Sequence, residues 1–238
     1  MTLKPETKAQ LEQVSVATLT TALFKRGLRH QVIQDVRPVG PKGRNMVGPA
    51  FTLRYMPARE DRNTLAVFRN PEHPQRHAIE TCPAGSVLVM DSRRDARMAS
   101  AGDILVSRLM VRGGAGIVTD GGFRDAMNIA RLEMPAYHNR PASPTNLTNN
   151  EAIDINVPIG CGDVAVFPGD IVVGDDDSVI VIPAEIADEI AAEATEMTAY
   201  EDFALEQVMN GATIIGLYPA TKEENLTKFA AWRKANNR

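Results

Sequence analysis

The chain contains little cysteine and few aromatic residues. It has two cysteines, Cys82 and Cys161, and Phe, Trp and Tyr together make up 5% of its 238 residues. So few aromatic side chains argue against a surface on which nucleic-acid bases stack. The N-terminal residues Met1-Thr2-Leu3-Lys4 are polar and do not resemble a signal peptide, so we expect a reducing, cytoplasmic location and no disulfide.

Long apolar runs and basic clusters are also missing. No apolar stretch is long enough to cross a bilayer, so no membrane span is expected. The net charge is −4 and lysine and arginine do not gather, which argues against a nucleic-acid partner. Nothing in the composition marks a Ser-, Gly- or Pro-rich linker, so residues 1–238 are expected to form one domain with helical appendages.

Apolar periodicity predicts an α/β protein with a central mixed sheet. Helical spacing runs from Pro5 to Gly27, and again from Pro183 to about Gly211. Strand-like segments lie between these helices, and from Ile153 onward they follow one another with short turns. The expected strands are residues 51–55, 86–91, 117–118, 134–137, 153–157, 164–167, 170–174 and 178–182.

The segment from Gly102 to Asp125 carries the most chemical information. Gly102-Asp103 opens a helical pattern that runs to Arg112. The free amides at the start of a helix, together with its dipole, form a ready anion site. The residues expected to face inward in this helix are Ile104, Leu105, Leu109 and Met110.

A glycine turn, a short strand and a second glycine turn then lead to Arg124-Asp125. If the strand at Ile117-Val118 lies beside the helix, this cation and carboxylate reach the same end of the unit as the helix start. Such a combination suits a small carboxylate-bearing substrate with a divalent metal. Adjacent Arg–Asp pairs are also common as solvated ions that contribute little, so the pattern leaves an ordinary surface turn open.

The run Gly113-Gly114-Ala115-Gly116-Ile117-Val118-Thr119-Asp120-Gly121-Gly122-Phe123-Arg124-Asp125, with Gly102-Asp103-Ile104-Leu105 before it, resembles the signature of the RraA-like family. That family includes class II pyruvate aldolases acting on 4-hydroxy-4-methyl-2-oxoglutarate and 4-carboxy-4-hydroxy-2-oxoadipate. Two flanking stretches, residues 48–52 and 157–177, are similar as well, so the resemblance covers about residues 15–215. It implies a compact swivelling β/β/α-type domain, a trimer or hexamer, and active sites between neighbouring subunits.

The resemblance also implies roles for individual residues. Asp125 would be the inner-sphere ligand of Mg²⁺ or Mn²⁺, and Arg124 would contact the substrate and stabilise an enolate. The amides of Gly102, Asp103, Ile104 and Leu105 would hold the pyruvyl carboxylate, and Asp103 would bind the metal through water. Glu201 would reach the metal from the neighbouring subunit. Ser178 departs from the family, which usually has glycine at this turn.

Two further expectations concern side chains outside this segment. Arg54 or Arg59 is a candidate to meet a distal carboxylate or hydroxyl of the substrate. His73 and His77 have the spacing of a zinc pair, but Pro74 between them favours a solvated loop.

The leading interpretation is a metal-dependent carbon–carbon lyase that cleaves a 4-hydroxy-2-oxo acid, with oxaloacetate decarboxylation as a side activity. One alternative is a dehydratase of a sugar-derived 2-oxo acid. The other is a non-catalytic, ribonuclease-binding regulator. The sequence does not distinguish which 2-oxo acid is the substrate or which divalent metal is used.

Overall fold

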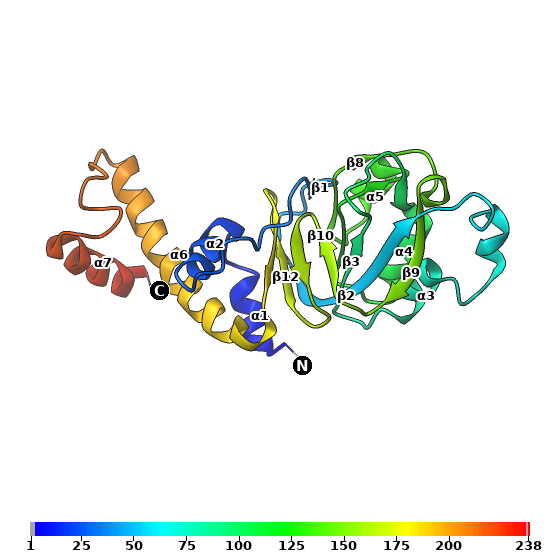
Figure 1. Ribbon diagram of the computed structural model, residues 1–238. Coiled ribbons are helices and arrows are strands. Elements are labelled where there is room, and N and C mark those ends of the chain that lie inside the picture. Colours follow the sequence, from blue (N-terminus) through cyan, green and yellow to red (C-terminus); the bar gives the residue numbers. More distant parts are fainter. Residues whose placement is uncertain (1–2, 237) are drawn as a thin grey trace.

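A mixed eight-stranded sheet forms the centre of the computed structural model, which describes residues 3–236 and 238 (Figure 1). Its order is β1-β7-β5-β3-β2-β12-β13, and β9 pairs with the second half of β2. The strands are β1 (Arg37–Pro38), β2 (Met46–Pro57), β3 (Val87–Asp91), β5 (Gly116–Thr119), β7 (Ala136–His138), β9 (Asn150–Ile155), β12 (Ile171–Gly174) and β13 (Val179–Ile182). The predicted α/β class with a mixed central sheet is confirmed.

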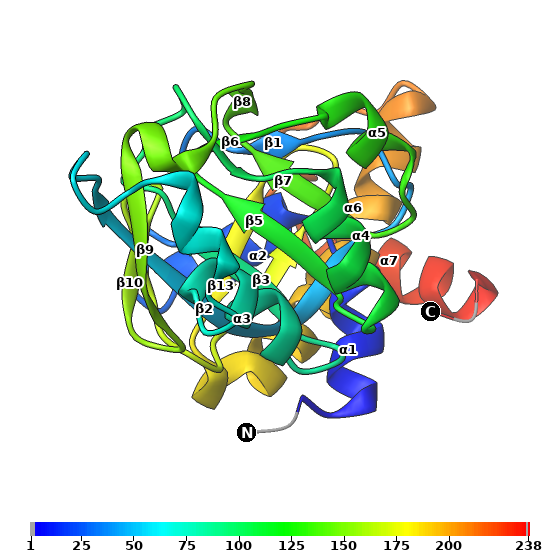
Figure 2. The ribbon, with the colours of Figure 1, turned by 90° about the vertical axis from the view of Figure 1, so that its right-hand side faces the viewer.

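Three helices connect the parallel strands of this sheet. They are α3 (Pro74–Thr81), α4 (Asp103–Val111) and α5 (Ala126–Arg131). In sequence, α3 joins β2 to β3, α4 joins β3 to β5, and α5 joins β5 to β7. Figure 2 shows α3, α4 and α5 in front of these strands. Parallel neighbours require such crossover connections, which place helices on a sheet face.

Alternation along the strands fills two cores. In β3, Leu88 and Met90 join the cluster that packs against α3, α4 and α5. Val87 and Val89 point to the other face and join a second cluster with β10 (Ile159–Cys161) and β11 (Val164–Val166). Side chains of a strand point alternately to opposite faces, so a strand covered on both sides is continuously apolar.

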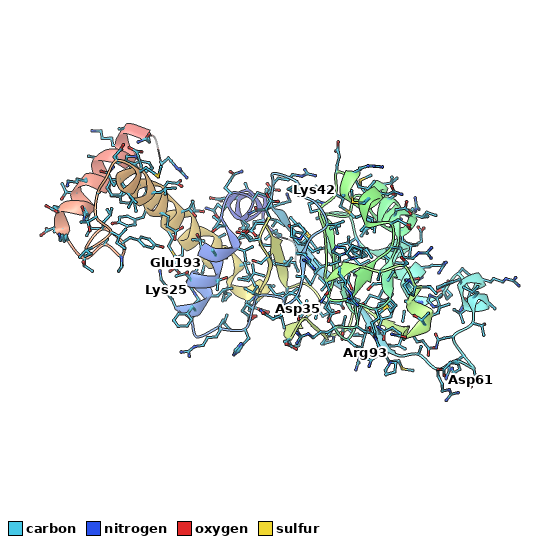
Figure 3. The ribbon with its side chains drawn as sticks, turned by 90° about the horizontal axis from the view of Figure 1, so that it is seen from above. Lys25, Asp35, Lys42, Asp61, Arg93 and Glu193 are labelled. Atoms are coloured by element: carbon cyan, nitrogen blue, oxygen red, sulfur yellow. The ribbon has the colours of Figure 1, made fainter. Side chains whose placement is uncertain are left out.

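Helices from both ends of the chain cover the β12–β13 end of the sheet. They are α1 (Pro5–Leu11), α2 (Val16–Phe24), the 3-10 turn η3 (Ala184–Ile186) and α6 (Ala187–Met209). Lys25, the residue after α2, pairs with Glu193 of α6 at 2.9 Å, and both are labelled in Figure 3. α6 then projects away from the sheet, and α7 (Glu223–Asn236) packs against its end through aromatic side chains (Figure 1).

The N-terminal prediction of one helix from Pro5 to Gly27 is wrong in detail. The chain forms two helices, because Ser15 leaves the helical conformation and its side chain accepts a hydrogen bond from the Thr18 amide. That is the usual N-cap of a new helix. Gly27 ends the second helical segment with φ +81°, as expected of a glycine stop.

The turn at residues 175–178 forms as predicted, although Ser178 replaces the family's usual glycine. The Asp175 carboxylate accepts hydrogen bonds from the amides of Asp177 and Ser178. Ser178 is not among the residues with positive φ, so the position does not require glycine.

Cys82 and Cys161 are both free and buried. Over the described residues, no helix has the length and apolar character of a membrane span.

Candidate functional site

Two short parallel strands bring the separate parts of the predicted site together. β4 (Ala99–Ala101) pairs with β6 (Gly122–Phe123), and Ala101 lies opposite Phe123. The next residues, Gly102 and Arg124, are therefore neighbours, and the Arg124 amide donates to the Ala101 carbonyl at 2.9 Å. The sequence pattern predicted that the strand at residues 117–118 would provide this proximity. The β4–β6 pairing provides it instead.

Neighbouring chain segments come so close to Gly121 and Gly122 that both positions require glycine. A Cβ atom on Gly121 would lie 2.7 Å from the Ser92 Cβ, and one on Gly122 would lie 2.5 Å from the Ala142 Cβ. No larger side chain fits at either position without displacing the neighbouring chain. This confirms the expectation that Gly121-Gly122 removes side-chain bulk.

The start of α4 offers amides without side-chain capping. Gly102 is the N-cap, and the first helical hydrogen bond runs from the Val106 amide to the Gly102 carbonyl. The amides of Asp103, Ile104 and Leu105 precede this bond and have no acceptor within the helix. They lie at the positive end of the helix dipole, where an anion is stabilised. The side chain of Ile104 is 81% exposed, so the expectation that it faces inward is wrong.

Asp125 has an unusual backbone conformation at the start of α5. Its φ of 55° and ψ of 34° lie in the left-handed region, which non-glycine residues seldom occupy except Asn and Asp. The Asp125 carbonyl accepts hydrogen bonds from the amides of Asn128 and Ile129. A Cβ atom built on Gly102 would lie 3.2 Å from Asp125 Oδ2. The carboxylate therefore sits against the start of α4.

A cavity of about 260 Å³ contains all these groups. Its lining includes every predicted residue of the central segment, namely Gly102, Asp103, Ile104, Leu105, Arg124 and Asp125. The structure thus brings together residues separated by more than twenty positions in the chain. A helix start, a guanidinium and carboxylates face one volume that suits a small acid.

The cavity also has lining residues that the sequence analysis did not identify. Arg76 and Gln75 come from α3, and Phe68 comes from the 3-10 helix η1 (Leu65–Arg69). Asn146 belongs to η2 (Asn146–Thr148) and is almost fully buried. These residues are distant in sequence from the glycine-rich signature, so no local pattern marked them.

A buried hydroxyl cluster lies behind the site. Ser100 Oγ is 2.6 Å from Ser92 Oγ and 2.7 Å from Thr119 Oγ1, and Ser100 immediately precedes the end of β4. Thr119 Oγ1 in turn accepts a hydrogen bond from the Gly121 amide. The cluster joins the ends of β3, β4 and β5 and so holds the loops that carry the site.

Asp120 ties three of these loops together. Its carboxylate is fully buried and accepts hydrogen bonds from the amides of Ser92, Arg94 and Gly162. Burial raises the pKa of Asp120 to about 6, because the charged form loses its hydration, while the three amide donors act in the opposite direction.

Oxygen donors in the cavity are compatible with a hard divalent cation. Asp125 is exposed to the cavity, and Asp103 Oδ2 accepts a hydrogen bond from Asn128 Nδ2 at 2.9 Å. Within residues 3–236 and 238, no three His, Cys, Asp or Glu side chains gather into a metal-binding group. Mg²⁺ and Mn²⁺ favour oxygen ligands, and Mg²⁺ commonly binds through one or two carboxylates while keeping several waters. Asp125 with Asp103 fits that pattern and does not fit a zinc site.

Glu201 lies on α6, outside this cavity. Its carboxylate accepts hydrogen bonds from Thr18 at 2.7 Å and from Tyr218 at 3.1 Å. Figure 1 shows α6 beyond the β12 end of the sheet, whereas α4 lies at the other end. A role for Glu201 at the cavity requires a second copy of the chain, as the resemblance implies.

Arg54 and Arg59 do not line the cavity. Arg54 is exposed on β2, while its neighbours Leu53 and Tyr55 point into the core. Arg59 pairs with Asp61 at 2.7 Å, and Figure 3 shows Asp61 at the tip of a projecting loop. Neither arginine is placed to meet a substrate bound within this chain's cavity.

The expectation that His73 and His77 lie in a solvated loop is wrong. Pro74 is the first residue of α3, a position where proline is favourable because the amide it lacks would have no helical acceptor. His73 precedes the helix, is buried, and packs edge-on against Phe68 with ring centroids 5.2 Å apart. Burial lowers its pKa.

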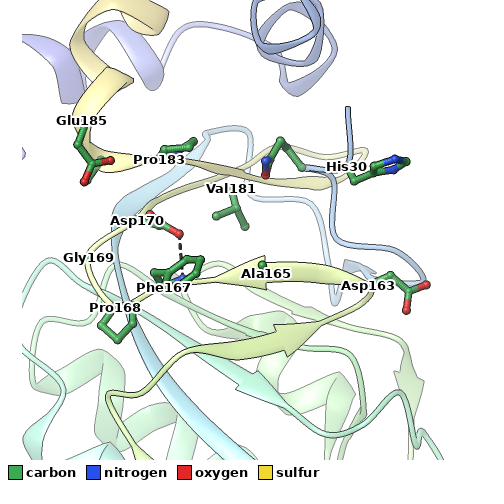
Figure 4. Close-up of a pocket in the computed structure, with 12 residues that line it drawn as sticks. His30, Asp163, Ala165, Phe167, Pro168, Gly169, Asp170, Val181, Pro183 and Glu185 are labelled. Carbon is green, nitrogen blue, oxygen red and sulfur yellow. Dashed lines mark hydrogen bonds between the residues drawn. The ribbon is translucent and has the colours of Figure 1, made fainter. Parts of the chain in front are cut away.

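A larger cavity of about 730 Å³ lies away from the predicted residues (Figure 4). It is bordered by the β11–β12 turn and by residues 181–185, with His30 and Asp163 on one side and Glu185 on the other. Its lining contains no arginine and none of the residues predicted for the site. The predicted residues therefore gather at the smaller of these two cavities.

Known proteins resemble this chain over most of its length. The family model RraA-like, described as Aldolase/RraA, matches residues 16–181. A protein of Halalkalibacterium halodurans named "Putative 4-hydroxy-4-methyl-2-oxoglutarate aldolase" is 32% identical over 165 residues, which are 69% of this chain and 72% of that protein.

Solved structures share the fold. RraAS2 of Streptomyces coelicolor, described as an unusual member of the RNase ES inhibitor RraA protein family, superposes with a TM-score of 0.74 at 31% identity. That likeness covers 86% of this chain and 98% of RraAS2. An uncharacterized protein from Pseudomonas syringae pv. tomato has a TM-score of 0.79 at 22% identity, over 92% of this chain and 95% of its own, and supports the fold alone.

Proposed function

The chain belongs to the RraA-like family, and we propose that it is a divalent-metal-dependent lyase that cleaves a 4-hydroxy-2-oxo acid to pyruvate and a second carbonyl compound. The cavity at the start of α4 supports this proposal most directly. It collects two arginines, two carboxylates and a run of uncapped amides from segments that are far apart in sequence. The aldolase name of the Halalkalibacterium relative agrees with it.

The groups of the cavity would bind different parts of the substrate. The amides of residues 103–105 would bind the carboxylate next to the 2-oxo group, since an anion is favoured at a helix start. Arg124 would donate to the oxygens of the 2-oxo acid and stabilise the negative charge that develops there. Its planar fork of donors suits two oxygens at once.

Mg²⁺ or Mn²⁺, held by Asp125 and through water by Asp103, would supply Lewis-acid polarisation of the 2-oxo group. Cleavage breaks the C3–C4 bond, and its electron pair becomes the enolate of pyruvate. The C4 hydroxyl loses its proton as the second carbonyl forms, and C3 of the enolate gains one. The cavity lining contains no histidine, so a water held near Asp103 and Arg124 is the proposed proton carrier.

A coupled assay of pyruvate release tests the proposal. We expect pyruvate from 4-hydroxy-4-methyl-2-oxoglutarate, and more slowly from oxaloacetate by decarboxylation, with loss of both in EDTA and recovery on adding Mg²⁺. Arg124→Ala should abolish release while leaving the melting temperature unchanged, because the side chain is exposed. Metal-independent release, or none from any 4-hydroxy-2-oxo acid, would contradict the lyase assignment.

The likeness to RraAS2 favours a second candidate, a regulator that binds a ribonuclease. Such a protein needs no reaction at the cavity. Binding to a ribonuclease that Arg124→Ala leaves intact, together with absence of pyruvate release, would favour the regulator. Formation of a 2-oxo product without C–C cleavage would favour the dehydratase alternative.

We also propose that the protein assembles as a trimer or hexamer in which Glu201 of one copy completes the site of another. The position of Glu201 on α6, at the opposite end from the cavity, is consistent with a role that only a second copy can fulfil.

A further inference from the structure

Arg76 brings a second cation into the candidate cavity. It lies on α3 and lines the same 260 Å³ volume as Arg124 and the start of α4. Its guanidinium carbon is 3.8 Å from the centroid of the Phe68 ring, within the range of a cation–π contact. Phe68 itself is braced by His73 on the same chain segment. The cation is therefore held at the cavity wall.

Arg76 lacks a counter-ion in the described part of the chain. Its one side-chain hydrogen bond there is a long contact from Nη1 to Gln75 Oε1 at 3.4 Å, and burial lowers its pKa. Arg108, which also belongs to a helix of this face, is by contrast held by the Glu80 carboxylate through two nitrogens. A half-buried arginine with no carboxylate partner is costly unless something else supplies the negative charge.

Gln75 keeps Arg76 oriented toward the cavity. The Gln75 side chain is buried, and its nitrogen donates to the Ser100 carbonyl at 2.6 Å and to Asn146 Oδ1 at 3.2 Å. These two bonds fix the amide, so its oxygen faces Arg76. Both partners of the Gln75 nitrogen are buried residues, so the part of the lining that carries Arg76 is anchored to the core.

The charges of the cavity point to a ligand with two negative groups. Arg76 and Arg124 carry one positive charge each, and Asp103 and Asp125 carry one negative charge each. With the divalent cation that the proposed function requires, the lining has an excess of two positive charges. One carboxylate at the α4 amides neutralises one of them, which leaves a second charge for the far end of the substrate.

We propose that Arg76 binds the distal carboxylate of the substrate and is the residue that selects a 2-oxo diacid over a 2-oxo monoacid. This inference rests on the proposed function for the orientation of the ligand, with its 2-oxo end at Arg124. It assigns to Arg76 the task that the sequence analysis gave to Arg54 or Arg59. Arg76 is a specificity-determining residue here and takes no part in breaking the C–C bond.

Binding of two non-cleavable acids of equal chain length tests Arg76 without relying on turnover. 2-Oxoglutarate carries the distal carboxylate, and 2-oxopentanoate has a methyl group in its place. Calorimetry with Mg²⁺ should show that the wild type binds 2-oxoglutarate at least about 10-fold more tightly than it binds 2-oxopentanoate. Arg76→Gln should weaken the binding of 2-oxoglutarate about 10- to 100-fold, as expected for loss of a charge-assisted hydrogen bond. The affinity for 2-oxopentanoate should stay within about threefold of the wild-type value.

Arg69→Gln is the matched control, because Arg69 is an exposed arginine of η1 that does not line the cavity. It should retain the diacid preference. Arg76→Lys should keep part of it, since the charge remains but the planar fork is lost. A purely structural role for Arg76 would lower the affinity for both acids equally and lower the melting temperature.

The outcomes separate this inference from the proposed function. A wild type that binds both acids equally, or an Arg76→Gln protein that keeps the preference, overturns the role of Arg76 even if pyruvate release is observed. Diacid preference that depends on Arg76 without any pyruvate release upholds the subsite and contradicts the lyase. Absence of binding to either acid overturns the role of Arg76, and it overturns the lyase as well only where no pyruvate is released.

Discussion

Gly102 and Asp125 approach so closely that a single added methyl group would touch the proposed metal ligand. A Cβ atom on Gly102 would lie 3.2 Å from Asp125 Oδ2 and 3.5 Å from Arg124 Cβ. The backbone at Gly102, with φ −121° and ψ 178°, is open to any residue. Glycine at this position therefore leaves space beside the Asp125 carboxylate, and its conformational freedom is not needed.

Gly102→Ala should therefore damage activity and spare stability. We expect kcat/KM for pyruvate release to fall about 10- to 100-fold, because a small displacement of reacting groups is costly. The melting temperature should change little. Gly160→Ala is the control, since nothing lies within 4 Å of a Cβ atom at Gly160. Equal kcat/KM for the two variants would show that the contact with Asp125 has no catalytic consequence.

Substitutions of Asp125 should separate its charge from its backbone conformation. Asp125→Asn tolerates the left-handed conformation, so the protein should stay folded but bind Mg²⁺ at least about 10-fold more weakly, as titration calorimetry would measure. Asp125→Ala should lose as much affinity for Mg²⁺ as Asp125→Asn does, and it should also lose about 1 kcal/mol of unfolding free energy because alanine is strained in the left-handed conformation. Unchanged Mg²⁺ affinity in Asp125→Asn would remove Asp125 from the proposed ligand set.

Asp120 should make stability depend on pH in mildly acidic solution. Its pKa is raised to about 6 in the folded protein, against an ordinary value of 3.8. Between about pH 4 and pH 6 the unfolded chain has lost this proton and the folded chain keeps it. The free energy of unfolding should therefore fall as pH rises through that window, by on the order of 2 kcal/mol from this group, and should level off above it.

Urea unfolding at pH 4, 5, 6 and 7 checks the Asp120 prediction against Asp120→Asn. Asparagine lacks the titrating proton, and its NH₂ group faces amide donors, so the variant should be less stable at every pH by about 1–3 kcal/mol. The stability difference between wild type and variant should be largest at pH 4. A difference that grows with pH would mean that the three amide donors outweigh burial.

Mixing two inactive variants should restore activity if neighbouring copies share a site. Arg124→Ala and Glu201→Ala damage different halves of the proposed site. Subunit exchange after mild denaturation should produce some sites that hold both native residues and release pyruvate. Recovery of a measurable fraction of wild-type activity would support the shared site. If Glu201→Ala alone is fully active, Glu201 serves only its hydrogen bonds with Thr18 and Tyr218.

The sequence indicated the fold class and the central segment because both depend on local signals. Short continuous apolar runs located β3 and β5, and helical spacing located α4 and α6, although Ser15 divided the N-terminal helix in two. The glycines before Arg124 could be recognised in the sequence as a place without side-chain bulk, and crowding by neighbouring atoms leaves no room there for a larger residue. Gly102 to Leu105, Arg124 and Asp125 were all named in advance, and all of them line one cavity.

Tertiary pairing decided the rest. The strands β4 and β6 have three and two residues, too few to produce a periodic signal, yet their register places Gly102 beside Arg124. Arg76 and Phe68 reach the cavity from segments whose local sequence is unremarkable for a binding site. The local sequence around these residues does not indicate which distant segments they will contact. The residue types were therefore set by the sequence, and their convergence on one volume was set by how the strands pair.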